Sequence, residues 1–252
     1  GVRLVDEQDD RLGRGLHLAD DALQAIFELA LHAGAGLERA EIERLAGDDS
    51  IGGLLLPLVG TPEWNLPHWE PLWEVLAHAG KPVVMHQGTG HDMIFYRGWG
   101  SPTANLLATQ SLAPRAAGLL ACSGVLERYP DLHFVFVEVN AGWMAWANST
   151  LDEYYEAHQM WTKPKLKELP SHYVKRQIHA TFQNDPVAVA NIPFTGADSL
   201  LWGNDFPHPE STFPNSAKVL QELFRDVNEA DALAITAGNA ARLFGFDQVV
   251  ME

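Results

Sequence analysis

The stretch LLWGNDFPHPES (residues 200–211) starts as an apolar run and ends among ionisable side chains. Its first three residues, 200–202, are large and apolar, which is typical of a buried strand. Asp205, His208 and Glu210 follow in quick succession around two prolines. The stretch therefore predicts a buried strand that presents a carboxylate and an imidazole at its carboxyl end.

Four further segments share this form, in which an apolar run is closed by polar residues or glycine: GGLLLPLVG (52–60), KPVVMHQGTG (81–90), LHFVFVEVNAGW (132–143) and HATFQNDP (179–186). Helical patterns separate and flank these strands, at 22–34, 37–47, 68–80, 102–129, 145–161 and 235–246. Strands that are apolar on both faces and alternate with helices predict a parallel sheet covered by helices. Because no linker or repeat interrupts the pattern, we expect one α/β domain over residues 1–252.

Such a sheet is either doubly wound or closed into a barrel. No G-x-G-x-x-G or G-x-x-x-x-G-K loop follows any of the strands, which disfavours the nucleotide-binding versions. A length of 252 residues suits a TIM-type (β/α) barrel, whose active sites lie at the carboxyl ends of the strands. We therefore expect a barrel and look for chemistry at the strand ends.

The composition is that of a packed, acidic protein, with 46% apolar residues, 20% charged residues and a formal net charge of −16. This charge would repel nucleic acid and anionic membranes, so neither is expected as a partner. The single cysteine, Cys122, excludes an internal disulfide and a thiolate zinc cluster, and it suits a reducing, cytoplasmic compartment. No apolar run is long enough to span a membrane.

Polar residues that could reach a shared centre end the strong strands. His86 follows PVVM, Glu138 follows FVFV, and Asp205 follows LLWGN. Gln183 and Asn184 follow ATF in the same way. One imidazole and two carboxylates at the mouth of a barrel would suit a divalent ion such as zinc or manganese. Two alternatives remain: Glu138 and Asp205 are the acid and nucleophile of a glycosidase, or these residues only cap strand ends. The second is disfavoured because burying several ionisable groups is costly.

Four motifs occur in an order and spacing that resemble a known family: KPVVMHQGTG, LERYPDLHFVFVEVNAGWMAW, LLWGNDFPHPES and GNAARLFGF. On these motifs, residues 50–246 resemble the amidohydrolase superfamily, in the branch that includes aminocarboxymuconate-semialdehyde and resorcylate decarboxylases. The resemblance implies a metal-dependent β/α barrel. In it, His86 matches the histidine at the end of the fifth strand, and Asp205 matches the aspartate at the end of the eighth. Glu138 stands at the sixth-strand position, where the decarboxylases often have histidine.

The resemblance also implies a function. His86, Asp205 and Glu138 would bind a divalent ion, with zinc as the first expectation and manganese as the second. The reaction would be hydrolysis or non-oxidative decarboxylation of a small organic acid or amide, with Asp205, Glu138 and His208 as catalytic residues. Because Glu138 replaces the sixth-strand histidine, neither reaction is preferred. Members of the family are often dimers, so a homo-oligomer, in the form of a dimer, is expected.

One feature of the family is missing from the sequence. The first strand of the family carries a metal motif of the H-x-H, E-x-H or D-x-H kind, and no H-x-H occurs in this chain. The D-x-H at 131–133 precedes a strand, and the E-x-H at 156–158 lies in a predicted helix. The predicted strands match the fourth to eighth of the barrel, with the third near residues 11–18. We expect a segment outside the recorded chain, or another chain, to supply the first strands. The alternative is a barrel that has lost its metal and serves as a scaffold or partner subunit.

Other side chains near the predicted strand ends are candidates for weaker reasons. Arg97 lies in the loop after His86 and is the best local choice for gripping a substrate carboxylate. Trp143 is expected to wall the pocket, whereas Trp146 is expected in the core of its helix. His179 is expected to precede its strand and so to lie at the opposite end of the barrel.

Overall fold

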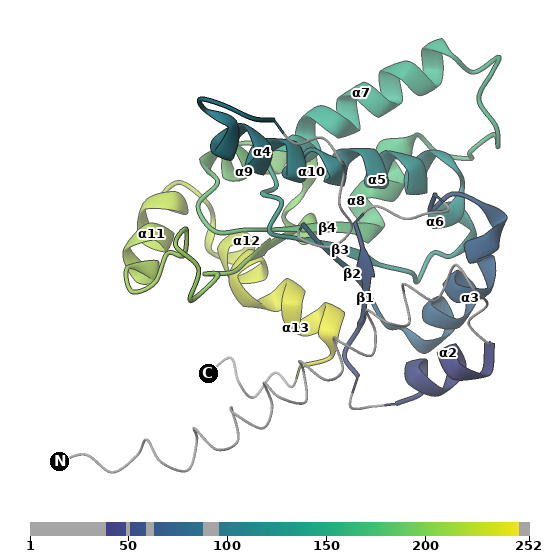
Figure 1. Cartoon of the computed structure of the whole chain (residues 1–252), viewed down its shortest axis with the longest axis horizontal. Helices are drawn as coiled ribbons and strands as arrows, with labels where there is room; N and C mark the ends of the chain where they lie inside the picture. The colour runs from purple at the N-terminus through teal and green to yellow at the C-terminus, as the bar shows by residue number, and fades with distance from the viewer. Residues whose placement is uncertain (1–38, 49–50, 59–62, 88–95, 247–252) are drawn as a thin grey trace.

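The computed structural model describes residues 39–48, 51–58, 63–87 and 96–246. The strands in these ranges are β1 (Leu54–Pro57), β2 (Val83–His86), β3 (Phe134–Val137), β4 (Ile178–Phe182) and β5 (Leu200–Trp202). They form one parallel sheet in the order β1-β2-β3-β4-β5. Helical segments follow every strand, as in a β/α barrel (Figure 1). The predicted alternation of strands and helices is therefore confirmed.

Helices surround this sheet (Figure 1). Before β3 they are α2 (Arg39–Ala46), η2 (Pro67–Trp69), α3 (Glu70–Ala79), α4 (Ser101–Gln110), α5 (Leu112–Cys122) and α6 (Val125–Arg128). Between β3 and β5 they are α7 (Trp143–Ala157), α8 (Pro170–Gln177), α9 (Pro186–Ala190), α10 (Ile192–Thr195) and η3 (Ala197–Ser199). After β5 they are α11 (Ser216–Leu223), α12 (Glu229–Leu233), the π-helical turn η4 (Ala234–Gly238) and α13 (Asn239–Phe244).

The core lies between the sheet and these helices. Phe134 and Phe136 of β3 and Phe182 of β4 are fully buried, and Trp73 of α3 packs edge-on against Phe134 at 5.4 Å between ring centroids. Three of the four residues of β3 are buried, although successive side chains of a strand point to opposite faces. The sheet is therefore covered on both faces, which is why its strands read as continuous apolar runs.

The single helix predicted over residues 102–129 is wrong, because the structure has three helices there. Helix α4 ends at Gln110, and Pro114 lies in the first turn of α5, where the lack of an N–H is tolerated. Gly124, with a φ of +76°, separates α5 from α6. The nearly continuous apolar pattern of 102–129 reads as one helix, although Pro114 and Gly124 mark where one helix ends and the next begins.

Several expectations fall outside the described residues. They include the helix at 22–34, the third strand near 11–18 and the loop at 88–95 after His86. Within the described ranges, no helix is both long and apolar enough to cross a bilayer.

A pair of histidines lies at the amino-terminal end of the sheet. His179 is the second residue of β4 and is 2% exposed, so the expectation that it precedes its strand is wrong, although it does lie at the amino-terminal end. Its Nδ1 lies 3.0 Å from the carbonyl oxygen of Asp198, which can only accept a hydrogen bond. His179 Nε2 lies 3.0 Å from His133 Nδ1. A neutral His179 that donates from Nδ1 to Asp198 can accept from His133 at Nε2, so the two contacts suit a neutral ring.

We expect this pair to make the protein sensitive to acid. Burial, followed by the charge of His133, lowers the pKa of His179 to about 3, from an ordinary value of 6.5. Below pH 6.5 the unfolded chain therefore binds a proton that the folded protein does not bind. The stabilisation from a neutral His179 is complete above pH 6.5 and is lost progressively as the pH falls, by about 1 kcal/mol per pH unit. Denaturant unfolding at about pH 7 and about pH 5 measures this slope. A His179→Gln variant with the same slope as the parent protein would contradict the assignment.

Candidate metal centre

Three strand ends bring the predicted site residues together. His86 is the last residue of β2, and it pairs in register with Val137, the last residue of β3. Glu138 follows Val137 directly, so the imidazole and the carboxylate leave neighbouring strands side by side. Asp205 comes three residues after the end of β5. The carboxyl ends of the parallel strands thus form the candidate site, as the sequence predicts.

The backbone is strained where both carboxylates leave the sheet. Glu138 has a φ of +60° and Asp205 a φ of +58°, and Asn140 in the loop after β3 has a φ of +52°. Non-glycine residues in this left-handed region are uncommon and cluster at functional sites. Both carboxylates therefore come from residues in the left-handed region, as is typical of functional sites.

The two carboxylates meet a second histidine as well. One ligand atom each of Glu138, Asp205 and His208 lies within 4.8 Å of the other two. His208 Nδ1 lies 3.3 Å from Asp205 Oδ1 and 3.9 Å from Glu138 Oε1. His86 adjoins the group through Glu138, with its Nε2 at 3.0 Å from Glu138 Oε1. The structure therefore brings His208 next to both carboxylates, and His86 beside one of them.

Glu138 is held by two residues that the sequence alone did not single out for this role. Gln87 Nε2 donates to Glu138 Oε2 at 3.2 Å, and the backbone N–H of Glu138 donates to Thr181 Oγ1 at 3.0 Å. Because a carboxylate can only accept hydrogen bonds, Glu138 must face the NH₂ group of the Gln87 amide. The Gln87 Oε1 atom is then buried without a hydrogen-bond donor. The position of Gln87 directly after His86, within the strand-end motif, was the available signal.

The loop after β3 is fastened by Asp185, which is 8% exposed. Its Oδ2 accepts from the backbone N–H groups of Ala141 and Gly142, at 2.9 and 2.8 Å. Its Oδ1 accepts from the N–H of Ala188 at 2.9 Å and so caps α9. One buried carboxylate therefore ties the segment that follows Glu138 to the segment that follows β4.

The loop after β5 closes on itself. The carbonyl oxygen of Asn204 accepts from Thr212 N at 3.1 Å and from Ser211 Oγ at 2.7 Å. Within this loop the N–H of His208 donates to the carbonyl of Asp205 at 3.0 Å. These bonds hold His208 over Asp205, which is the arrangement that the opening stretch of sequence suggests.

The carboxylate pair fits a cation. The side chains of Glu138 and Asp205 are only 14% and 13% exposed, and Asp205 Oδ2 is buried with no hydrogen-bond partner. Burial and the adjacent Glu138 carboxyl raise the pKa of Asp205. Burial also acts to raise the pKa of Glu138, but Asp205 and the His86 ring outweigh it and hold that pKa below its usual range. A divalent ion bound here would give the unpartnered Asp205 Oδ2 a ligand bond and offset the repulsion between the two carboxyls, with the two imidazoles as further possible ligands.

Two other predicted site residues, Arg97 and Trp143, have contacts that do not test their predicted roles. Arg97 is exposed in the segment before α4, and its role stays a prediction. Trp143 begins α7, packs edge-on against Phe136, and donates from Nε1 to the carbonyl of Asn140 at 2.9 Å. Its role in the pocket likewise stays a prediction. Trp146 is 63% exposed, so the expectation that it lies in the core is wrong.

The remaining strand-end amides differ from each other. The carbonyl of Gln183 accepts from Trp202 Nε1 at 2.8 Å, and the Gln183 side chain acts to lower the pKa of Asp205. Asn184 is exposed. Of the two, only Gln183 contributes to the surroundings of the carboxylates.

Comparison with known proteins supports the fold. The chain is similar to 5-carboxyvanillate decarboxylase from Sphingomonas paucimobilis, with 21% identity and a TM-score of 0.69 over 83% of this chain and 63% of that one. It is also similar to 2,6-dihydroxybenzoate decarboxylase from Rhizobium, with 18% identity and a TM-score of 0.66 over 93% and 79% of the two chains. A 5-carboxyvanillate decarboxylase from Novosphingobium aromaticivorans with bound manganese has 14% identity and a TM-score of 0.67, over 93% and 72%.

These similarities confirm the predicted TIM-type β/α barrel. The chain spans less than two thirds of the length of the Sphingomonas decarboxylase. No curated protein matches it. A family model described as Amidohydrolase matches residues 2–246, nearly the whole sequence. The chain therefore belongs to the amidohydrolase family.

Proposed function

We propose that this protein is a metal-dependent enzyme that acts on a small organic acid, and that it removes a carboxyl group without oxidation. Two observations support the proposal: ligand atoms of Glu138, Asp205 and His208 lie within 4.8 Å of one another, and His86 Nε2 lies 3.0 Å from Glu138 Oε1. The unpartnered Asp205 Oδ2 supports a cation at this place. Manganese is bound in two similar decarboxylases, so manganese is proposed beside zinc.

The substrate class is proposed from the same similar proteins. Their names give 5-carboxyvanillate and 2,6-dihydroxybenzoate as substrates, and both are hydroxylated aromatic carboxylates. An aromatic acid of this kind is the first substrate to test here. Hydrolysis of an amide or ester is the alternative reaction. It is favoured by Glu138, which stands at the position where the decarboxylases that the chain resembles often have histidine.

The roles of the side chains follow from their places. His86, Glu138 and Asp205 would hold the ion, which would supply polarisation of a bound carboxylate or carbonyl. Asp205, beside the ion, would take and return a proton at the reacting carbon. His208 is 54% exposed beside Asp205 and would contact the substrate from the solvent side. In hydrolysis, Asp205 would accept a proton from the attacking water.

Domain organisation, oligomeric state and cellular compartment are also proposed. We propose that the whole chain is one domain, that it works as a homo-oligomer and that it resides in the cytoplasm. The continuous order of the five described strands supports a single domain.

The function is tested by assay of the purified, metal-stripped protein after addition of manganese or zinc. Release of carbon dioxide from hydroxylated benzoates is measured beside hydrolysis of a matched set of aryl amides. A Glu210→Gln variant serves as control, because Glu210 is an exposed acid of the same loop. We expect turnover that depends on the added metal. Metal binding without any turnover would favour a scaffold, and turnover without metal would contradict the proposal.

Gln87 should matter for metal affinity. A Gln87→Leu change removes the donor to Glu138 Oε2 and leaves that carboxylate less well oriented. Loss of such a supporting hydrogen bond typically weakens metal binding by about 10- to 100-fold. Competition with a chelator for manganese measures the affinity, and Gln221→Leu on the exposed surface of α11 is the matched control. Equal affinities of the two variants would show that Gln87 does not position Glu138.

A further inference from the structure

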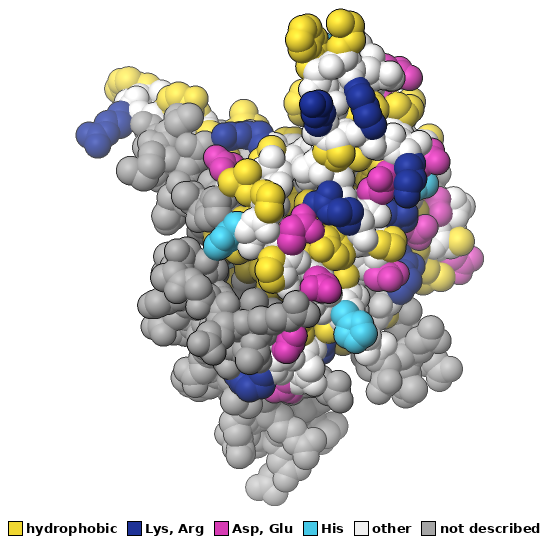
Figure 2. Space-filling model, turned by 90° about the vertical axis from the view of Figure 1, so that its right-hand side faces the viewer, with side chains coloured by type: hydrophobic (Ala, Val, Ile, Leu, Met, Phe, Trp, Pro, Cys, Tyr) yellow, Lys and Arg dark blue, Asp and Glu magenta, His cyan; other side chains and the backbone are white. Residues whose placement is uncertain are grey.

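The segment after α7 carries a surface that the proposed active site does not use. Residues 158–167, with the sequence HQMWTKPKLK, contain three of the six lysines of the chain and no aspartate or glutamate. The whole chain has 33 acidic residues and a net charge of −16, so this stretch is exceptional. Hydrophobic and basic side chains gather at the top of the view in Figure 2, where α7 ends. We name residues 158–167 the basic knob.

The basic knob exposes large apolar side chains on an ordered backbone. Met160 is 83% exposed and Trp161 is 77% exposed. The knob is fastened to the helices beneath it, because Leu166 N donates to Tyr155 Oη at 2.7 Å and Lys167 N donates to Glu127 Oε2 at 2.8 Å. An exposed tryptophan in a segment whose backbone is hydrogen-bonded to the helices beneath it suits a role as an interface hot spot.

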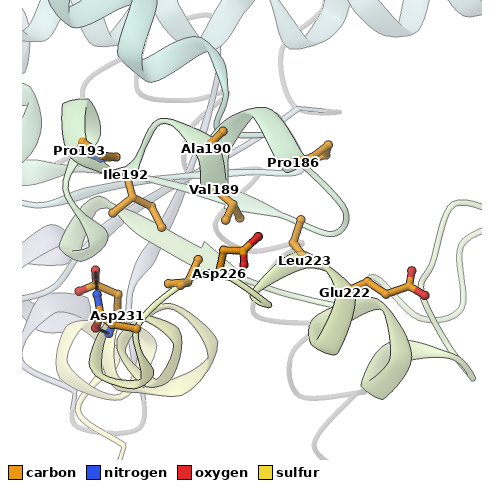
Figure 3. Close-up of a pocket in the computed structure, with 11 residues that line it drawn as sticks. Pro186, Val189, Ala190, Ile192, Pro193, Glu222, Leu223, Asp226 and Asp231 are labelled. Atoms are coloured by element: carbon orange, nitrogen blue, oxygen red, sulfur yellow. Dashed lines mark hydrogen bonds between the residues drawn. The ribbon is translucent and has the colours of Figure 1, made fainter.

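A pocket with the opposite character lies on another part of the molecule (Figure 3). It has a volume of about 540 Å³ and lies between α9 and α10 on one side and α11 and α12 on the other. Apolar side chains from both sides line it, among them Val189, Ile192 and Leu223. All of its ionisable lining residues are acidic, namely Glu222, Asp226 and Asp231. We name it the acidic pocket.

We propose that the protein self-associates by placing the basic knob of one copy in the acidic pocket of a second copy. Trp161 and Met160 would enter the apolar part, and Lys163 and Lys165 would face Glu222 and Asp226. The volume lies within the range of pockets that enclose small organic groups.

Charge complementarity favours a second copy of the chain as the partner of the acidic pocket. Two copies of a chain with a net charge of −16 repel each other, and a local basic surface set against an acidic one offsets this repulsion. In Figure 1, α7 runs away from α9–α12, so the knob of one copy does not reach its own pocket. Because the contact joins two different surfaces, two copies can exchange their knobs reciprocally, or several copies can form a head-to-tail ring. This inference is independent of the proposed reaction.

Two charge-reversed variants of the full chain test the contact. The knob variant carries Lys163→Glu and Lys165→Glu, and the pocket variant carries Glu222→Lys and Asp226→Lys. All four side chains are exposed, so folding should be retained. Sedimentation velocity is expected to show that the parent protein associates and that each variant alone associates at least about 30-fold more weakly, the scale of a hot-spot loss. An equimolar mixture of the variants should associate again, because an acidic knob then meets a basic pocket.

Two control variants separate this contact from a general effect of surface charge. Lys175→Glu reverses an exposed lysine on α8 and should leave association unchanged. A Trp161→Ser variant should weaken association even in high salt, where charge contacts are screened. The proposal is overturned if the parent protein stays monomeric, if the variants associate as the parent does, or if their mixture does not recover. Binding of a monomeric parent protein to phosphatidylserine vesicles through the same lysines would assign the basic knob to a membrane instead.

Discussion

Replacement of Asp205 by asparagine is expected to reduce turnover by about 10²- to 10⁴-fold, the usual effect of removing a group that transfers a proton. The change keeps the size of the side chain but removes the proposed anionic metal ligand and proton acceptor. Steady-state kinetics of the metal-loaded protein measure the loss. Glu210→Gln, an exposed acid in the same loop, should retain full activity.

The same variant should not lose stability when the metal is absent. Burial and the adjacent Glu138 raise the pKa of Asp205, so its ionised form is unfavourable in the metal-free fold. A neutral amide relieves that repulsion, and the thermal midpoint of the metal-free variant should equal or exceed that of the parent protein. A clear fall in the midpoint together with retained activity would mean that Asp205 has a structural role and no catalytic one.

The change Asp185→Ala is expected to lower the free energy of unfolding by about 3–5 kcal/mol. The reason is that buried N–H groups lose their carboxylate acceptor and are left without a hydrogen-bond partner. Ala141, Gly142 and Ala188 each donate to this carboxylate. Urea unfolding measures the loss, with Asp131→Ala as an exposed control. Since the bonds also fasten the loop after Glu138, metal affinity should fall as well. A loss below about 1 kcal/mol, within the range of ordinary surface changes, would show that the loop is held by other contacts.

The strands were predictable because burial on both faces leaves a strong trace in the sequence. FVFV in β3 is buried almost throughout, and the polar residue after it marks where the strand leaves the core. Parallel strands put their carboxyl ends at one edge, so the approach of Glu138 to His86 and Asp205 followed from topology alone. His208 was predicted near Asp205 because it follows in the same short loop.

The contacts between loops were beyond the sequence. Nothing in FQNDP distinguishes Asp185, which caps a helix and fastens a distant loop, from an ordinary helix-capping aspartate. The sequence suggested that β4 begins after His179, because a polar residue interrupts the apolar pattern at that position. In the structure the strand begins one residue before it, at Ile178. Trp146 follows the apolar spacing of α7 but is exposed, since helical periodicity does not say which neighbours cover a helix.

We propose that His86, Glu138 and Asp205 hold a divalent metal ion, and elemental analysis of the purified protein is the first experiment to make. The parent protein is compared with a His86→Ala and Asp205→Ala double variant, each after incubation with manganese and zinc and removal of the excess. We predict about one equivalent of metal in the parent protein, as for a single mononuclear site, and none in the double variant. A parent protein that binds no metal, or a double variant that retains the full equivalent, would contradict the assignment of this centre.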